Sequence, residues 1–301
     1  MRSRNKFALH LRAFAKVNLG LKLLAKRADG YHEIRTIYQT IALHDRLEIS
    51  LDKAGEGIRL ECDNLEMPAG RENLVYRACE LWRRATGFRG GVRVRLEKNI
   101  PAGSGLGGAS SDAAAALEGL ERLAGERLPE RLLFHLAAQL GSDVPLFLLG
   151  GRVLGCRRGE EVYPLSDLSP RKCLVVFPGF SISTTEAYGE AGLLLTRRGK
   201  DRSMKSVGAW PQFSLLHWGP AENDFERVVF ARWPELARVK RLLIRAGAEI
   251  ASLTGSGSAL FAVFPSAPQL LRASKLIPRG WLKFTTRTLS RAEYWRLRFA
   301  R

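Results

Sequence analysis

A glycine-rich stretch about a third of the way along the chain carries the clearest chemical signal. Within residues 101–117 four glycines occupy six positions, and two serines and a run of alanines follow. A loop without side chains lets backbone N–H groups close around an oxyanion. A helix after it directs its positive dipole end and unpaired N–H groups to the same point. The stretch predicts a phosphate-binding loop; the alternative is an ordinary glycine-rich turn before a helix.

Three common phosphate loops do not fit this stretch. Gly103-x-Gly105-x-x-Gly108 matches the dinucleotide-binding pattern, but residues 98–101 separate it from the preceding apolar run, and a Rossmann loop follows its strand directly. The Walker pattern fails because no lysine follows Gly108. A protein-kinase glycine loop lies between two strands, whereas this one opens a helix.

Two charged residues elsewhere are candidates for catalysis. Lys16 lies between the alternating apolar segments 7–13 and 17–23, which predict two strands. It is either a fixed cation for a phosphate or an acid, or a solvated surface lysine. Asp143 stands between the helix stop at Gly141 and the apolar run 144–149. Burying such an acid is costly unless it is paired or employed; the alternative is an exposed helix cap.

Two further segments hold residues that suit a planar or phosphorylated ligand. Tyr31 and His32 directly follow an Asp-Gly turn. They form either a stacking and hydrogen-bonding pair for a planar ligand or a half-buried hairpin edge. A second glycine-containing segment, Thr-Gly-Ser-Gly at 254–257, is either a second binding loop or a tight β-turn.

The composition of the chain limits its class. It has 301 residues, 46% of them hydrophobic, and a net charge of +18, which suits two globular domains. No apolar run approaches a membrane span, and no signal-peptide core follows the basic first residues. The four scattered cysteines favour reduced thiols and a cytoplasmic location. No RNA- or DNA-binding motif accompanies the charge, so we expect neither nucleic acid nor membrane as a partner.

Hydrophobic periodicity predicts a mixture of strands and helices around these residues. Besides the two strands near Lys16, we expect strands near 47–51, 58–62, 92–96, 174–177, 250–253, 260–264 and 281–288. Helices are expected near 73–86, 110–123, 129–140, 184–195 and 267–276, with two more on either side of Pro234. This alternation is typical of α+β proteins.

Six motifs in order resemble one family. Ala-Lys-Val-Asn-Leu at 15–19, the glycine stretch and the 254–257 motif are similar to the three-motif signature of the GHMP small-molecule kinases. Arg-x-Asp-Gly-Tyr-His at 27–32, Gly-x-Asp-Val-Pro at 141–145 and Asn-Asp-Phe-Glu at 223–226 narrow the resemblance. They point to the branch that phosphorylates the 2-hydroxyl of a cytidine diphosphate ester of methylerythritol in the non-mevalonate isoprenoid pathway.

The resemblance implies the fold of that family. It predicts a two-domain α+β protein, with an N-terminal α/β domain similar to ribosomal protein S5 domain 2 over residues 1–155. A ferredoxin-like α+β domain would follow over residues 156–301, with the active site in the cleft between them. The family also implies ATP and Mg²⁺ as cofactors, and we expect a monomer or a homodimer.

The resemblance also assigns roles to individual residues. Lys16 and Asp143 fall on the positions of the catalytic lysine and the catalytic base. The cytidylyl-substrate positions are matched by Asn18, Tyr31, His32, Thr184, Tyr188, Gly255 and Gly257. The ATP-binding positions are matched by Pro101, Ala102, Gly103, Ser104, Gly105, Leu106, Gly107, Gly108, Ala109, Ser110 and Ser111, with Asn73 and Lys98 on the adenine side. Ser111 is also the candidate Mg²⁺ ligand, because Mg²⁺ prefers oxygen donors.

Some features depart from the family pattern, and two other classes remain as alternatives. Phe14 stands where the family usually has proline, and Tyr188 where phenylalanine is frequent. The basic segment after about residue 290 has no family role. Another GHMP kinase, for mevalonate, homoserine or a sugar, would share the glycine loop but has no need of the Tyr-His pair. An RNA-associated protein of the same fold would need neither Lys16 nor Asp143.

Overall fold

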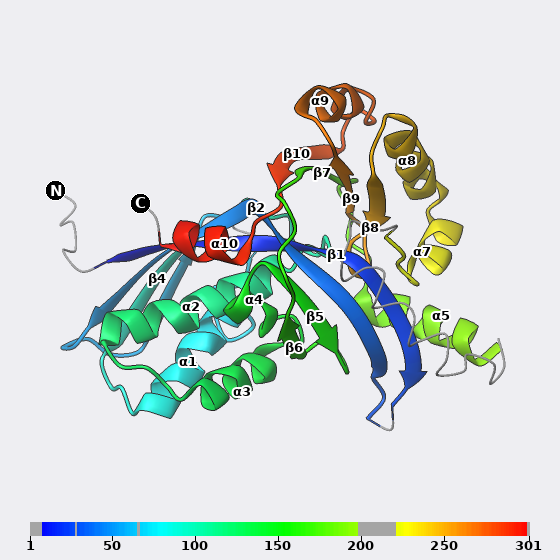
Figure 1. Cartoon of the computed structure of the whole chain (residues 1–301). Helices are drawn as coiled ribbons and strands as arrows, with labels where there is room; N and C mark the ends of the chain where they lie inside the picture. The colour runs from blue at the N-terminus through cyan, green and yellow to red at the C-terminus, as the bar shows by residue number, and fades with distance from the viewer. Residues whose placement is uncertain (1–7, 28, 65–66, 198–220, 300–301) are drawn as a thin grey trace.

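Two long antiparallel strands, β1 (Leu9–Lys26) and β2 (His32–Asp52), run through the middle of the molecule (Figure 1). The computed structural model describes residues 8–27, 29–64, 67–197 and 221–299. The six-stranded first sheet pairs β1 with β2 and has the order β3-β4-β2-β5-β6. Its other strands are β3 (Ile58–Cys62), β4 (Gly91–Glu97), β5 (Arg152–Cys156) and β6 (Glu161–Pro164).

A second sheet of four strands completes the predicted α+β architecture. Its order is β10-β7-β9-β8, with β7 (Lys172–Phe177), β8 (Ile250–Leu253), β9 (Leu260–Phe264) and β10 (Leu282–Arg287). One face of this sheet packs on helices, while Val175 and Phe261 on the other face join Val17, Ile37 and Leu106 in a shared core. This core holds the two sheets together beside the glycine loop, which contributes Leu106.

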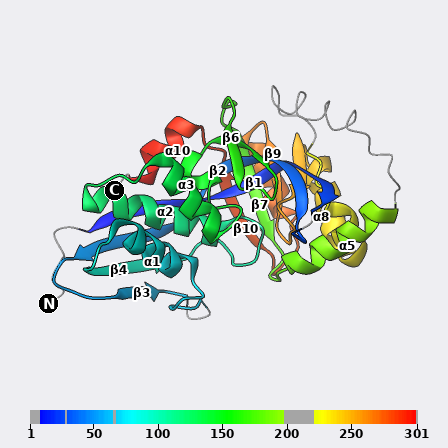
Figure 2. The same ribbon diagram turned by 90° about the horizontal axis from the view of Figure 1, so that it is seen from below.

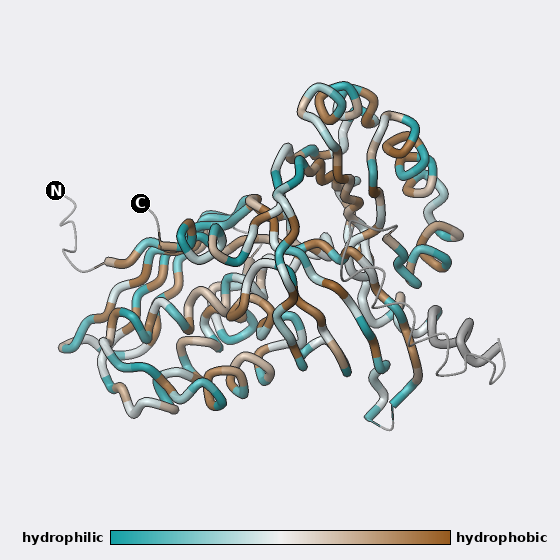
Figure 3. Tube along the Cα trace, in the orientation of Figure 1, coloured by the Kyte–Doolittle hydropathy of each residue, from teal (hydrophilic) through white to brown (hydrophobic). Residues whose placement is uncertain are grey.

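The helices cover the two sheets separately. α1 (Leu74–Thr86), α2 (Gly108–Ala124), α3 (Glu130–Leu140) and the short α4 (Leu146–Leu149) lie with the first sheet (Figure 2). α7 (Glu226–Arg232), α8 (Pro234–Arg245) and α9 (Ala267–Lys275) lie with the second, next to α5 (Thr184–Arg197). In Figure 3, α8 and α9 alternate brown and teal, as expected for helices with one buried face. Within the described residues, no helix is long and apolar enough to cross a membrane.

The local sequence explains why α1 and α2 form where they do. Asn73 caps α1 by accepting from the Val75 N–H at 2.9 Å, and Gly87 ends the helix in the left-handed conformation. α2 is buried along most of its length, and its alanines let it approach β1 and β2 closely. A Cβ on Gly119 would lie only 2.8 Å from Ile49. The central helix that opens with the glycine loop is therefore fixed tightly to the first sheet.

Three features of the first sheet differ from the sequence prediction. The described part of the segment 7–13, from Leu9 on, and the segment 17–23 belong to one strand, β1, because an irregularity in the register between Phe14 and Lys16 interrupts the alternation without ending the pairing; Phe7 lies outside the described residues. β2 extends far beyond the predicted 47–51. β5 and β6 were not predicted, and both pair within the first sheet.

The sheet order bears on where the domain boundary is drawn. The predicted boundary after residue 155 falls inside β5, whereas the first sheet continues to Pro164. The chain then passes to the second sheet, and α10 (Arg291–Arg298) returns to pack beside β1 (Figure 1). We therefore propose a first unit that ends near residue 164 and takes α10 as an additional element.

Candidate active site

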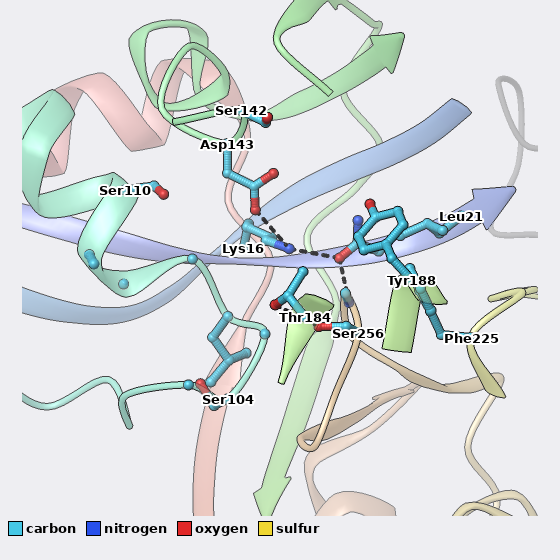
Figure 4. Close-up of a pocket in the computed structure, with 18 of the residues that line it drawn as sticks. Lys16, Leu21, Ser104, Ser110, Ser142, Asp143, Thr184, Tyr188, Phe225 and Ser256 are labelled. Carbon is cyan, nitrogen blue, oxygen red and sulfur yellow. Dashed lines mark hydrogen bonds and ion pairs between the residues drawn. The ribbon is translucent and has the colours of Figure 1, made fainter. Parts of the chain in front are cut away.

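A cleft of about 870 Å³ opens between the two sheets, beside the glycine loop. Residues from both halves of the chain line it (Figure 4). The predicted site residues that line the cleft are Lys16, Asn18, Tyr31, His32, Lys98, residues 101–110, Asp143, Thr184, Tyr188 and Gly255. Three predicted site residues, Asn73, Ser111 and Gly257, are not among its lining residues.

The glycine loop needs its glycines for backbone shape and for close approach. Gly103, Gly105 and Gly107 have φ values of 62°, 81° and 73°, which side-chain-bearing residues rarely adopt. A Cβ on Gly105 would lie 2.2 Å from the Thr254 carbonyl oxygen. Gly107 is the N-cap of α2 and offers no side-chain cap. The N–H groups at the start of α2 are therefore available to an anion in the cleft.

Lys16 and Asp143 form an ion pair at the centre of the cleft. Lys16 Nζ lies 3.2 Å from Asp143 Oδ2, and its side chain is 3% exposed while that of Asp143 is 30% exposed. Lys16 comes from β1 at the register irregularity, and Asp143 from the turn between α3 and α4. The lysine is thus fixed in the wall, and the carboxylate reaches the open cleft, which is the placement a proton acceptor needs.

Tyr38 also belongs to this centre, although it is not among the site residues predicted from the sequence. Its hydroxyl donates to Asp143 Oδ1 at 2.9 Å, and Lys16 Nζ lies 5.5 Å from its ring centroid. Burial, and after it the charge of Asp143, raises the pKa of Tyr38 well above its usual value, so the hydroxyl remains a donor. Gly155 and Gly159 make room for the ring, since a Cβ on either would lie within 2.5 Å of Tyr38.

Asn18 connects the centre to the second glycine segment. Its Oδ1 accepts from Lys16 Nζ at 2.9 Å, from the Gly255 N–H at 2.8 Å and from Thr254 Oγ1 at 3.2 Å. Its Nδ2 donates to Thr36 Oγ1 at 2.7 Å. The side chain is occupied by these bonds, so its evident role in this state is to position Lys16 and the 254–257 segment.

The 254–257 segment is a tight turn that also faces the cleft. The Gly257 N–H donates to the Thr254 carbonyl at 3.0 Å, as in a β-turn. Gly255 lines the cleft, whereas a Cβ on Gly257 would meet Ile182 and Leu253 at 3.1 and 3.2 Å. The segment is therefore a tight turn, and through Gly255 it also faces the cleft. Gly257 instead packs against Ile182 and Leu253.

Aromatic side chains form the far end of the cleft. His32 and Tyr188 stack with ring centroids 5.5 Å apart, and Phe225 meets the Tyr188 ring edge-on at 4.7 Å. Tyr31 is 56% exposed, and the Arg158 guanidinium lies 4.9 Å from its ring centroid.

His32 has an unused polar atom at this end. Its Nε2 is buried and has no hydrogen-bond partner among the described residues. Burial, and after it the charge of Lys26, lowers the pKa of His32, so the ring is neutral at pH 7. Thr184 Oγ1 lies 3.2 Å from Ser256 Oγ at the floor of the cleft. The arrangement offers flat faces and one free nitrogen to a planar ligand.

The two predicted adenine-side residues differ in position. Lys98 lines the cleft, but its ammonium is paired with Asp45 and, at 2.7 Å, with Asp112. Burial opposes its charge, yet the two carboxylates outweigh burial and raise the pKa of Lys98. Asn73 caps α1, and its Nδ2 donates to the Pro68 carbonyl at 2.8 Å. The structure therefore does not bring the Asn73 side chain to the cleft.

The two serines after the glycines also separate. Ser110 lines the cleft (Figure 4). Ser111, the predicted metal ligand, is completely buried, and its Oγ has no hydrogen-bond partner among the described residues. Adjacent residues of an α-helix point in directions about 100° apart, so the side chains of Ser110 and Ser111 face different sides of α2. No cluster of three or more metal-ligating side chains occurs within the described ranges.

Comparisons with known proteins found two family models and several relatives that are similar to this chain. The family model "GHMP kinases N terminal domain" matches residues 73–151, and "GHMP kinases C terminal" matches 213–275. A protein of Solibacter usitatus (strain Ellin6076) named 4-diphosphocytidyl-2-C-methyl-D-erythritol kinase is 46% identical over 89% of this chain and 85% of its own length.

Solved structures give the same picture. A crystal structure of 4-(cytidine 5'-diphospho)-2C-methyl-D-erythritol kinase aligns with a TM-score of 0.74 at 34% identity, covering 93% of this chain and 99% of the other. Homoserine kinase from Cytophaga hutchinsonii ATCC 33406 aligns with a TM-score of 0.70 at 18% identity, covering 96% and 97%. That second similarity concerns the fold alone.

Proposed function

Because the chain belongs to the 4-diphosphocytidyl-2-C-methyl-D-erythritol kinases of the GHMP kinase family, we propose that its cleft transfers a phosphoryl group from ATP to the 2-hydroxyl of this cytidylyl ester. The observation that carries the proposal is the Lys16–Asp143 pair, 3.2 Å apart and next to the glycine loop. Phosphoryl transfer depends on positioning, on neutralising charge and on a group that accepts the hydroxyl proton. The described residues offer all three.

The glycine loop holds the triphosphate of ATP. Backbone N–H groups of the loop and of the first turn of α2 bind the phosphate oxygens, and the dipole of α2 adds to their attraction. Lys98 remains paired with Asp45 and Asp112. It therefore contributes to the adenine side by fixing the start of the loop, where Asp45 Oδ1 also accepts the Ile100 N–H at 2.8 Å.

Asp143 accepts the proton of the attacking hydroxyl. Lys16, 3.2 Å from the carboxylate, stabilises the alkoxide that develops as the proton leaves. Tyr38 occupies Oδ1 of Asp143 as a donor and so leaves Oδ2 to face Lys16 and the substrate. Asn18 keeps Lys16 in place through its 2.9 Å hydrogen bond.

Mg²⁺ fits this site as an ion held largely by ATP and water. Mg²⁺ retains several waters and uses few protein oxygens when it binds with a nucleotide. Ser110, whose side chain lines the cleft, is the hydroxyl that suits it, in place of the buried Ser111. When bound, the ion neutralises phosphate charge.

The aromatic end of the cleft holds the cytosine. Tyr31 and Tyr188 supply flat faces for stacking, and the free Nε2 of neutral His32 bonds to the polar edge of the base. Arg158 at the same end, together with Lys26, suits the diphosphate of the ester. Mevalonate and homoserine, the substrates of other GHMP kinases, have no base to place there.

The test is a comparison of substrates with the purified full chain, ATP and Mg²⁺. We expect ADP to form with the cytidylyl ester and not above background with mevalonate or homoserine. Turnover of mevalonate or homoserine in preference to the ester would keep the kinase chemistry but reject the substrate. A binding assay with ATP alone separates a protein that binds no nucleotide from one that lacks the right acceptor.

A further inference from the structure

We propose that the C-terminal helix α10 is a positioning element of the active site. It fixes the turn that carries Asp143 through a hydrogen bond from the Tyr294 hydroxyl. The inference rests on the kinase function proposed above and adds a residue to it. α10 lies outside both matched family segments, 73–151 and 213–275. The family resemblance gives no role to this basic end of the chain.

The turn that carries Asp143 is one hydrogen-bonded unit. The Val144 N–H donates to the Gly141 carbonyl at 3.1 Å, the Phe147 N–H to the Val144 carbonyl at 3.1 Å, and the Gly150 N–H to the Leu146 carbonyl at 2.9 Å. Val144, Leu146 and Phe147 have no exposed surface. A displacement at the Phe147 end of this unit is therefore passed on to Asp143, which is four residues away.

Phe147 connects this unit to the glycine loop as well. A Cβ on Gly107 would lie 3.0 Å from the tip of the Phe147 ring and 3.1 Å from the Lys16 side chain. The ring therefore lies against the residue that begins α2, next to the catalytic lysine. Phe147 thus contacts the phosphate loop with its side chain and is linked to Asp143 through the backbone of the turn.

α10 forms a hydrogen bond to the backbone of the same residue. The Tyr294 hydroxyl donates to the Phe147 carbonyl at 2.6 Å, and Trp295 Nε1 donates to the Leu149 carbonyl at 3.1 Å. The carbonyls in the last turn of a helix have no partner within it, so α4 needs such donors. Gly150 makes the approach possible, because a Cβ there would lie 2.2 Å from the Tyr294 ring.

α10 is itself fixed to the first sheet, so it can act as a rigid support. Ser290 and Glu293 form a capping box at its start. Arg298, completely buried, pairs with Glu118 of α2 and donates to the Tyr294 hydroxyl. Phe14, the departure from the family's usual proline, packs on Tyr294 with ring centroids 5.4 Å apart. Side chains from β1 and α2 therefore hold Tyr294 against the Asp143 unit.

Two roles of α10, covering the core and positioning Asp143, lead to different results when the helix is disturbed. Loss of a cover lowers thermal stability and leaves the turnover of the folded enzyme unchanged. Loss of positioning lowers kcat in the fully folded enzyme, while the KM values for ATP and for the ester, set by other walls of the cleft, change little.

The central test is Tyr294→Phe in the full chain, assayed below the unfolding transition. The variant keeps the ring and removes the hydroxyl, and with it the bond to the Phe147 carbonyl and the bond from Arg298. We expect kcat to fall about 3- to 10-fold, the range set by the net worth of one hydrogen bond, with both KM values within about twofold. Val239→Ala, a buried change in α8 of the other core, is the matched control. It lowers the melting temperature without changing kcat.

A second pair of variants keeps the test informative if Tyr294→Phe folds poorly. Ser290→Ala removes the cap of α10 and lowers kcat, whereas Ser290→Thr retains a capping hydroxyl and restores kcat. Wild-type kcat in a folded Tyr294→Phe enzyme, or in Ser290→Ala, overturns the proposal.

Amide hydrogen exchange examines the same coupling without turnover. We expect faster exchange of the Phe147 and Gly150 amides in Tyr294→Phe and not in Val239→Ala. If the wild-type enzyme does not phosphorylate the ester, the function proposed above fails, and the exchange result still decides whether α10 holds this turn. Unchanged exchange in Tyr294→Phe contradicts the coupling whatever the substrate is.

Discussion

At the scale of single residues, the site depends on how one carboxylate is held. Asp143 accepts from Tyr38 on one oxygen and faces Lys16 on the other, and both partners are almost completely buried. A carboxylate with two fixed partners has one orientation, so the reacting hydroxyl meets a preorganised acceptor.

Replacing Asp143 by asparagine tests this arrangement. The amide keeps the size of the side chain but cannot take the proton of the hydroxyl. We expect kcat to fall about 10²–10⁴-fold, with ATP affinity little changed. Steady-state kinetics together with calorimetry of ATP binding measure both effects, and near-wild-type turnover would remove Asp143 from the mechanism.

Replacing Tyr188 by alanine tests the nucleobase end. The substitution removes one stacking face and leaves the phosphate loop untouched. Binding of the cytidylyl ester is expected to weaken by roughly 1–3 kcal/mol, as for other base–aromatic stacks, while ATP binding stays the same. Equal loss of both affinities would mean that Tyr188 supports the fold rather than the base.

The sequence was a better guide to some of these residues than to others. Lys16 and Asp143 were candidates because a charged residue beside apolar runs needs an explanation, but only the family resemblance assigned their roles; the cleft contains both. Tyr38 was missed, because a tyrosine in an alternating strand has the appearance of an ordinary core residue. Only the glycines at 155 and 159, which make room for its ring, were a possible clue, and their meaning depends on a strand pairing invisible in the sequence.

At the scale of elements, the strain-prone backbone of the glycine loop is what brings the phosphate site together. Gly107 has a φ of 73°, and a Cβ there would press on both Phe147 and Lys16. The loop is therefore fixed by its neighbours as well as by its own conformation.

Gly107→Val is the corresponding test. A branched side chain at this φ costs ~1–3 kcal/mol of backbone strain and displaces Lys16, so we expect the KM for ATP to rise roughly tenfold or more. Circular dichroism should show that the fold survives. Unchanged nucleotide affinity in calorimetry would make the loop a structural turn.

The cluster of Lys98, Asp45 and Asp112, which fixes the start of the glycine loop, contains a group with a strongly raised pKa. Asp112 shares the Lys98 ammonium with Asp45, and burial raises the pKa of Asp112 from its usual 3.8 to about 8, although Lys98 opposes the shift. The folded protein thus keeps a proton that the unfolded chain releases above pH 4. The contribution of Asp112 to stability accordingly falls as pH rises from about 4 to about 8 and changes little above that.

Asp112→Asn should remove this dependence. Urea unfolding at pH 5 and pH 8 measures it. The wild-type protein is expected to lose on the order of 1–3 kcal/mol more than the variant over this interval. An equal loss in both proteins would show that another group titrates. Lys98 and Asp45 remain paired in the variant, so the start of the loop keeps its anchor.

Elements were predicted well where local patterns decide them, and poorly where long-range contacts do. α1, α2, α3 and the strands of the second sheet follow from periodicity and from their glycine and proline stops. The continuity of β1 through Lys16 was not predictable, because β2 supplies the pairing that carries the strand across the irregularity. α10 was missed because an arginine in a sequence is expected at the surface. The burial of Arg298 depends on its pairing with Glu118, which the sequence does not show.

At the scale of the whole molecule, the cleft exists because two sheets share a core next to the glycine loop. Val17 and Leu106 from the first half pack with Val175 and Phe261 from the second. α10 then ties the end of the chain back to the first sheet. The residues proposed for ATP lie mainly in the first unit, and those proposed for the base lie on both sides of the junction. The positive charge of the chain suits two phosphorylated substrates.

The central claim is that this cleft places the 2-hydroxyl of the cytidylyl ester at Asp143 and next to the γ-phosphate of ATP. Phosphorus NMR of the reaction mixture tests it most directly, because it reports both the donor and the position that is phosphorylated. We expect ATP to be converted to ADP while one new monoester signal appears on the 2-oxygen of methylerythritol, and Asp143→Asn to slow both changes together. ADP without a new monoester, or a phosphoryl group on another hydroxyl, would contradict it.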